Sequence, residues 1–536
     1  MKRVVAAAFS AACYLYRTYL PQNSQHRSTG LIRLLFLNSD DRDFRSLSTI
    51  FLVVACVLGF TFQVDARAQS GATTIFNSHV NTWLTNPGAY SNGLPTALTH
   101  VQIVTTNTLT NQPISGAFAL NMSGNAYMRS LSVGNGNTYN VNLPSNARHL
   151  FLGSSSPTES LITVTNNSTL SFSLTGSGTV SLVSSGNFRI DSGSSLNVTA
   201  AITGTAAISK TGAGIATFSG VNTYSGGTNI NGGTLAVANA AALGSTGTIS
   251  FGGGTLQYNG ITTDFSSRFS TAANQAYSIN TNGNNVSFAG TLVSSGGSMF
   301  KSGNGTLTLT GTGNTYNGGT TVGAGVLVAT GPLANQSFHV ASGATLQSSA
   351  ALNATGNNTI NGTVNGDFNL LAGGTLKGDG TLTGAVQIGG KLAAGNSIGL
   401  LKIDGSVTFG ANSIFEVEID TVNPPAADLV AVKNVLSLNN AELSLVDFAN
   451  ANSPVALGTE FQIATFGTLS GRFLGLNEGA RFDRIGNTWA ISYGITKPGA
   501  ITLTAVPEPS AFLFVGVGLG WHLLRRRTRP ASQLAC

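Results

Sequence analysis

Short alternating runs of apolar and polar residues, separated by glycines, make up most of this chain. A period of two residues is typical of a strand with one buried face, and paired glycines such as Gly226-Gly227 supply the positive φ angles of tight corners. The run from Thr228 to Ile230 lies between two glycine pairs and has room for only one short strand. The pattern therefore predicts an all-β protein of short strands and sharp turns.

Two segments repeat one pattern with an offset of 91 residues before a turn and 92 after it. Residues 210–220 (KTGAGIATFSG) recur as 301–311 (KSGNGTLTLTG), and residues 222–235 (NTYSGGTNINGGTL) recur as 314–327 (NTYNGGTTVGAGVL). One such unit cannot bury its apolar residues alone, so successive units must stack as rungs. We expect a right-handed parallel β-helix over residues 166–420, with an inner column that contains Ile230, Leu235, Val322 and Leu327.

These segments resemble the autotransporter-associated β-strand repeat, whose pattern joins a Gly-x-Gly strand, Asn-Thr-Tyr, Gly-Gly-Thr and a second strand. True autotransporters end in a membrane β-barrel of at least eight strands. After Asp420 only about 85 residues remain before the chain's terminal segment, too few for such a barrel. We expect residues 69–165 to be a less regular β-rich region and residues 421–505, beginning near Pro424-Pro425, to be a small β cap.

The end of the chain has three parts in order: Pro507-Glu508-Pro509, the apolar run 511–524, and a basic cluster of Arg525, Arg526, Arg527 and Arg529. The prolines favour an extended backbone. Fourteen residues of helix span roughly 21 Å, less than the ~30 Å hydrocarbon core, so the run predicts a marginal single-pass helix. The arginines hold this end on the cytoplasmic side, which places the body outside.

This order of parts, over residues 506–529, resembles the PEP-CTERM sorting signal of exported proteins from Gram-negative bacteria that make exopolysaccharide. The resemblance implies recognition by an exosortase-like enzyme and processing near Pro507-Glu508-Pro509. The alternative is an ordinary single-pass anchor with an incidental Pro-Glu-Pro.

The start of the chain agrees with export. An apolar run from Ser48 to Phe62 is followed by Ala66-Arg67-Ala68, a small-x-small pattern that predicts signal-peptidase cleavage after Ala68. Residues 1–68 are then a signal peptide with a long n-region, or the true start lies further along. Cys56 loosely suggests a lipoprotein site, but the apolar run continues past it.

Charge and cysteine usage separate the body from the two targeting ends. Residues 69–505 contain 14 basic and 15 acidic residues, so the basic balance of the whole chain comes from its ends and gives no footprint for nucleic acid. The three cysteines, Cys13, Cys56 and Cys536, all lie outside the body, so no disulfide is expected there. A hydrophobic content of 42 % argues against disorder.

The sharpest enzymatic hypothesis concerns Glu416, Glu418 and Asp420, which alternate with Val417 and Ile419 and would share one face of a strand. Neighbouring carboxylates would lie ~6.6 Å apart, within the range used by inverting glycosidases. A solvated acidic face and weak Ca²⁺ binding are the alternatives.

Other candidate residues have weaker support. Ser397 lies in a Gly-x-Ser-x-Gly motif, but no helical period and no suitable histidine follow it. The body's histidines lack metal-ligand spacing: His79, His100, His149 and His339. Tyr224 and Tyr316 recur at equivalent turn positions, which favours packing over sugar stacking.

We therefore assign no catalytic, metal or cofactor residue. The sequence predicts an exported structural or adhesive β-solenoid of the cell envelope, outer surface or extracellular matrix, anchored transiently in the inner membrane. Its expected partners are signal peptidase, an exosortase-like enzyme, and exopolysaccharide or other surface proteins. The runner-up is a carbohydrate-active β-helix enzyme.

Overall fold

The structure is a computed structural model, and it describes the body of the chain. Described residues are 73–76, 82–84, 100–103, 117–122, 126–128, 130–134, 136, 138–143, 149–153, 160–174 and 178–508. The predicted signal peptide with Ala66 and Ala68, and the tail from Pro509 through Arg525, Arg526, Arg527 and Arg529, lie outside them. Within the described residues, 47 strands and a single 3-10 helix form, and no helix has the length and hydropathy needed to cross a bilayer.

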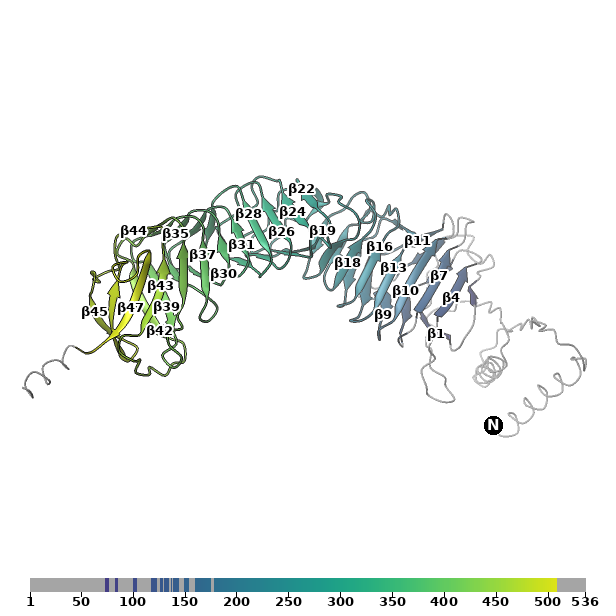
Figure 1. Cartoon of the computed structure of the whole chain (residues 1–536). Helices are drawn as coiled ribbons and strands as arrows, with labels where there is room; N and C mark the ends of the chain where they lie inside the picture. Colours follow the sequence, from purple (N-terminus) through teal and green to yellow (C-terminus); the bar gives the residue numbers. More distant parts are fainter. Residues whose placement is uncertain are drawn as a thin grey trace, which may run out of the picture.

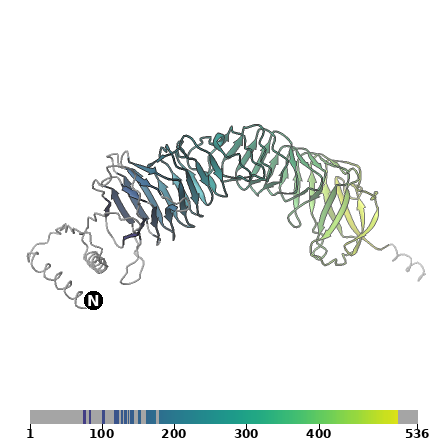
Figure 2. The same ribbon diagram turned by 180° about the vertical axis from the view of Figure 1, so that it is seen from behind.

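The strands stack into an elongated, bent solenoid (Figure 1), and the view from behind shows the same continuous stack (Figure 2). Each arm of the bend has three sheets. Sheet 1, in the N-terminal arm, contains β1 (Thr73–Phe76), β3 (His100–Ile103), β6 (Ser130–Val133), β9 (Ser160–Val164), β12 (Gly186–Ile190), β15 (Ile208–Thr211), β17 (Thr228–Ile230) and β19 (Ile249–Phe251).

Sheet 2 runs through both arms and pairs each strand with the one before it from end to end. It contains β2 (Thr82–Leu84), β4 (Ala117–Met122), β7 (Thr138–Leu143), β10 (Thr169–Leu174), β13 (Ser195–Val198), β16 (Ile215–Phe218), β18 (Thr234–Val237), β20 (Thr255–Tyr258), β21 (Ala276–Asn280), β23 (Ser298–Ser302), β25 (Thr320–Val322), β27 (Phe338–Val340), β30 (Asn357–Ile360), β33 (Thr375–Lys377), β36 (Lys391–Ala393), β39 (Ile414–Ile419) and β42 (Glu442–Asp447). Sheet 3 completes the N-terminal arm with β5 (Ala126–Met128), β8 (His149–Leu152), β11 (Thr179–Leu182) and β14 (Ala201–Gly204).

Sheets 4 and 5 complete the C-terminal arm. Sheet 4 contains β22 (Val286–Phe288), β24 (Thr306–Leu309), β26 (Val326–Ala329), β28 (Thr345–Ser348), β31 (Thr363–Asn365), β34 (Thr381–Leu382), β37 (Leu400–Ile403), β40 (Leu429–Val432), β43 (Glu460–Thr465), β47 (Ala500–Val506), β46 (Asn487–Ser492) and β45 (Arg481–Arg484). Sheet 5 contains β29 (Leu352–Ala354), β32 (Phe368–Leu370), β35 (Val386–Ile388), β38 (Val407–Phe409), β41 (Val435–Ser437) and β44 (Thr468–Ser470).

The all-β parallel solenoid is confirmed, and parallel pairing extends beyond the limits predicted for it. β1 already pairs in parallel with β3, and β41 pairs in parallel with β44, so the stack reaches outside residues 166–420 on both sides. Among the described strands, antiparallel strand pairs occur only among β43, β47, β46 and β45, where the chain folds back at the C-terminal end of sheet 4. Two isolated antiparallel bridges, Gly378 with Gly395 and Ile419 with Ala427, lie outside these pairs. The right-handedness of the coil stays a prediction.

The inner column also agrees with the prediction, because Ile230, Leu235, Val322 and Leu327 are all fully buried. Register places like residues above one another: Ala216, Leu235 and Leu256 are successive Cα partners on β16, β18 and β20. The apolar side chains of each rung therefore pack against those of the next rung inside the solenoid.

The two sequence repeats occupy different sides of the solenoid. In the first copy, β15 and β17 belong to sheet 1 while β16 and β18 belong to sheet 2. In the second copy, the corresponding β23 and β25 belong to sheet 2 while β24 and β26 belong to sheet 4. The repeat pattern has therefore moved by one side between the copies.

This change of side occurs at a joint between β20 and β22, around the 3-10 helix η1 (Ser266–Arg268). The Arg268 guanidinium donates to the carbonyl oxygens of Leu243, Gly244, Thr246 and Gly247, in the turn that precedes β19. Aromatic rings fill the interior, including Phe251, Phe269 and Tyr277, with centroids 4.9 to 6.1 Å apart.

Leu235→Ala tests the stacked core. Because Leu235 is fully buried between partners on β16 and β20, the truncation should lower the free energy of unfolding by about 2–5 kcal/mol. Chemical unfolding followed by circular dichroism measures this loss. Val221→Ala, at a side chain that is 62 % exposed, should change stability by less than about 0.5 kcal/mol. Equal effects of the two variants would contradict a core at Leu235.

Candidate functional site

A buried lysine lies at the same position in each repeat copy. Lys210 Nζ donates to the carbonyl oxygens of Thr211, Gly212 and Gly232 at 2.9 to 3.0 Å. Lys301 Nζ donates to those of Ser302, Gly303 and Ala324 at 2.7 to 3.0 Å. Both lysines are fully buried. We call each lysine with its three acceptors a lysine clasp, because it joins a turn of its own rung to a turn of the next.

The asparagine and tyrosine of the repeat are also internal. The side-chain oxygen of Asn222 accepts from Ile202 N, and that of Asn314 accepts from Leu292 N, at 2.8 and 2.9 Å. Tyr224 and Tyr316 are fully buried and bond the hydroxyls of Thr228 and Thr320. The expectation of packing rather than sugar stacking is confirmed.

The most distinctive polar residues of the repeat therefore stabilise the stack. A buried polar group without a partner costs about 1–3 kcal/mol, and the clasps and asparagines satisfy backbone groups at the corners where strand pairing stops. The sequence analysis missed the lysines as internal groups. Their recurrence at equivalent positions beside a Gly-x-Gly turn was the available signal.

The predicted carboxylate row is only partly present. β39 directs Glu416 and Glu418 outward while Val417 and Ile419 are buried, as predicted. Glu416 forms an ion pair of 2.9 Å with Lys391 of the neighbouring strand. Asp420 follows the strand, is almost fully buried, and accepts bonds from the backbone of Val422 and Asn423. The bond from Asn423 holds the pKa of Asp420 below its usual value. Asp420 therefore caps a turn and does not share an exposed face with Glu416 and Glu418.

A buried aspartate that the sequence analysis did not single out lies beside Glu418. Asp428 is 1 % exposed, and its carboxylate accepts from Gly399 N and Glu418 N at 2.9 Å. Burial is the main cause that raises the pKa of Asp428 to about 7; the carboxylates of Glu418 and Asp379 act in the same direction, and the two amide bonds oppose them. Glu418 Oε2 is buried without a partner among the described residues. A buried carboxyl with a raised pKa beside a second carboxylate is an arrangement that suits acid–base chemistry.

The remaining candidates form no site. Ser397 is exposed in the bend between β36 and β37, and a strand follows it where a nucleophile elbow needs a helix. No group of three metal-binding side chains occurs among the residues that the structure describes. Pro507 is half-buried and Glu508 exposed directly after β47, and the rest of the predicted sorting motif is outside the described part.

Comparison with known proteins supports the repeat assignment. The model of the passenger-associated transport repeat matches residues 208–237 and 299–329, the segments that hold the two lysine clasps. No curated protein matches the chain. Among solved structures, the Haemophilus influenzae Hap adhesin is similar at 11 % identity with a TM-score of 0.22; the match covers 83 % of this chain and 63 % of that one. The described chain is thus an all-β solenoid with two autotransporter-type repeats.

The clasps predict a specific pH dependence. Burial lowers the pKa of Lys210 and of Lys301 to about 8, whereas an unfolded lysine titrates near 10.4. Above pH 8 the unfolded chain therefore binds more protons at these lysines, and the free energy of unfolding should rise with pH from about 8 to about 9. This window lies below about pH 10, where tyrosines of the unfolded chain ionise while buried ones such as Tyr224 and Tyr316 stay protonated. Urea unfolding across this range measures the slope. Lys301→Met should reduce the slope and the double variant with Lys210→Met should abolish it; an unchanged slope would contradict the assignment.

Proposed function

We propose that this protein is an exported, non-enzymatic rod that serves as a structural or adhesive element at the cell surface or in an extracellular polysaccharide matrix. The observation that carries the proposal is the inward direction of the repeat's polar residues. Lys210, Lys301, Tyr224 and Tyr316 are all fully buried, so the repeats build a long neutral rod whose outer faces are free to make contacts. The match to a passenger-associated transport repeat supports export.

Sorting forms the second part of this proposal. Signal peptidase would remove residues 1–68, and the apolar run 511–524 would hold the chain in the inner membrane until an exosortase-like enzyme processes it near Pro507-Glu508-Pro509. The extended, solvent-accessible exit of the chain at Pro507 and Glu508 suits recognition of backbone and side chains there. A nearly neutral body gives no reason to expect nucleic acid as a partner.

A second candidate function is cleavage of extracellular polysaccharide, and it is favoured by the buried Asp428 carboxyl, whose pKa is raised to about 7, beside the Glu418 carboxylate. The geometry weighs against it, because both oxygens of Asp428 are used by backbone amides and Glu416 is paired with Lys391. Release of reducing ends by the purified protein, abolished by Glu416→Gln or Glu418→Gln, would establish the enzyme and overturn the structural role. We expect no release.

The sorting motif can be tested in cells that contain the processing system. Pro507→Ala with Glu508→Ala should leave the chain unprocessed in the inner membrane, because neither residue contributes to membrane burial while both belong to the motif. Fractionation and the mass of the mature protein give the readout. Replacing the apolar run 511–524 by another of equal hydrophobicity is the matched control and should be tolerated. Normal processing of the double variant would refute recognition of Pro-Glu-Pro.

A further inference from the structure

Phe300 is an aromatic side chain on the outside of the solenoid, where alternation would place a polar one. In the strand Ser298–Ser302, Met299 and Lys301 point inward, and Phe300 is 43 % exposed on the outer face of sheet 2. A Cβ atom added at Gly323, one rung on, would lie 3.2 Å from both Cε2 and Cζ of Phe300. The tip of the ring therefore rests over Gly323, and any larger residue there would displace it.

The first repeat copy has a different pair of residues at these two positions. Ser209 corresponds to Phe300, and Asn231 corresponds to Gly323. There, Asn231 Nδ2 donates to Ser209 Oγ at 2.9 Å across the same two rungs. The second copy has exchanged this hydrogen-bonded pair for an exposed ring and the glycine that makes room for it. A change at both partners maintains the ring at the surface, although its exposure contributes nothing to the core.

Hydroxyl groups surround the ring. Ser298 and Ser302 lie two residues away on the same strand, and Ser278 and Thr321 are its register partners on β21 and β25. All four are partly exposed. Strand geometry places them about 5 to 7 Å from Phe300, roughly the width of one sugar ring. An apolar face framed by hydroxyls matches a pyranose, whose C–H face stacks on aromatic rings and whose rim exchanges hydrogen bonds.

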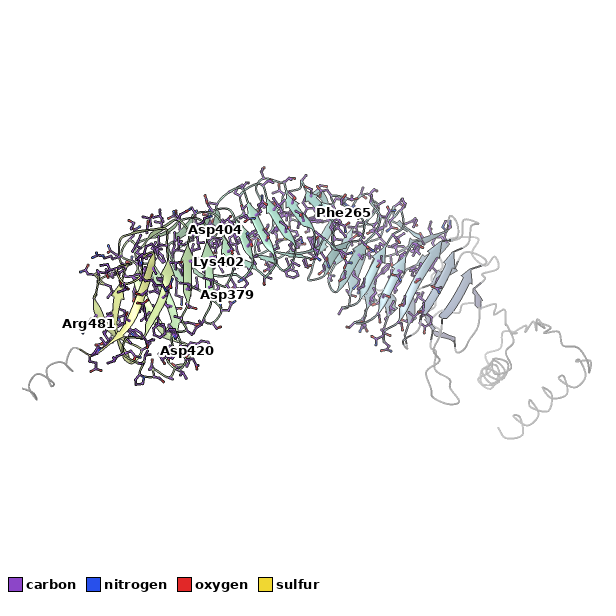
Figure 3. All side chains as sticks on the ribbon, in the orientation of Figure 1. Phe265, Asp379, Lys402, Asp404, Asp420 and Arg481 are labelled. Atoms are coloured by element: carbon purple, nitrogen blue, oxygen red, sulfur yellow. The ribbon has the colours of Figure 1, made fainter. Side chains whose placement is uncertain are left out.

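The scarcity of charged side chains around Phe300 indicates an uncharged ligand. Residues 192–366 contain only four charged residues: Lys210, Asp264, Arg268 and Lys301. The lysines are buried in the clasps, Arg268 is bound to backbone carbonyls, and Asp264 accepts bonds from Ser266 and Ala289. The charged side chains labelled in Figure 3, such as Lys402 and Asp404, lie further along the chain, beyond residue 366. His339 is the register partner of Thr321, and burial lowers its pKa, so it is uncharged near neutral pH. The face around Phe300 therefore presents no positive charge to an acidic polymer.

We propose that Phe300, with Ser278, Ser298, Ser302 and Thr321, forms a binding site for an uncharged polysaccharide. This inference rests on the proposed surface function and names the ligand class for it. One ring framed by hydroxyls buries far less area than the ~1,000 Å² of a protein interface, which favours a sugar over a protein partner. The affinity of one site is weak, and display of many copies on a surface compensates through avidity.

The test uses a variant that transplants the first copy's pair into the second. Phe300→Ser with Gly323→Asn should fold normally, since it recreates the Ser209–Asn231 hydrogen bond, and an unchanged melting temperature checks this. Co-sedimentation of the full chain with microcrystalline cellulose and insoluble β-1,3-glucan measures binding, with calcium alginate as the acidic polymer. Phe300→Leu, which keeps an apolar side chain but removes the aromatic face, is the second variant, and Val221→Ser is the exposed control.

We expect the natural chain to bind at least one uncharged polymer, with the same affinity at low and high salt. Both Phe300 variants should weaken binding about tenfold or more, while Val221→Ser should not change it. Binding to alginate alone, no binding to either uncharged polymer, or full binding by a folded Phe300 variant would overturn the inference. Protease accessibility of the chain on intact cells separates this outcome from the proposed function: a surface-exposed chain that binds no glycan refutes only the Phe300 site.

Discussion

Parallel hydrogen bonding between successive rungs is the constraint on which this structure depends. A single rung of short strands has no partner for its backbone within itself, so every strand needs the strand one turn away. Pairing stops at the corners, and the buried groups there must be satisfied by side chains. Lys210 and Lys301 bond carbonyls from two rungs at once, and Asn222 and Asn314 bond amides. The recurring polar residues of the repeat thus supply the hydrogen-bond partners that buried corner groups need.

The same constraint explains the two irregular places in the stack. At the C-terminal end, β47, β46 and β45 cover the last parallel edge of sheet 4 with antiparallel strands, which satisfies the backbone groups of β43. At the joint, Arg268 donates to carbonyl oxygens of the turn before β19, while Asp264 accepts from the amide of Ala289. Tyr258 is fully buried there, and its hydroxyl has no partner among the described residues. Hydrogen bonding is therefore less complete at the joint than at the C-terminal end of sheet 4.

The sequence predicted the stacking and the inner column because both follow from local periodicity. Ile230 and Leu235 recur as Val322 and Leu327. Short rungs can bury such side chains only inside the stack, and all four are buried there. The side occupied by each copy was not predictable, since an offset of 91 to 92 residues does not reveal the number of sides passed. In Ser298–Ser302, the charged side chain is buried and the aromatic one is exposed, the reverse of what hydrophobicity alone predicts. Lys301 is buried because its ammonium group bonds three carbonyl oxygens, and Phe300 lies on the outer face. The burial of Asp428 was not predictable from the sequence, because it depends on a tertiary contact with Gly399.

The central claim is that the parallel strands of sheet 2 stack without interruption through both arms, whereas sheet 1 ends and sheet 4 begins at the joint. The repeat pattern therefore moves by one side there. Thr255 and Ser278 are register partners across the joint, with their hydroxyl oxygens 2.8 Å apart. The body contains no cysteine, so Cys13, Cys56 and Cys536 can be replaced by serine and new pairs introduced. Thr255→Cys should form a disulfide with Ser278→Cys under mild oxidation and should fail to do so with Asn285→Cys, the position that would face it if both copies shared the same sides. A disulfide between positions 255 and 285, with none between 255 and 278, would contradict the account.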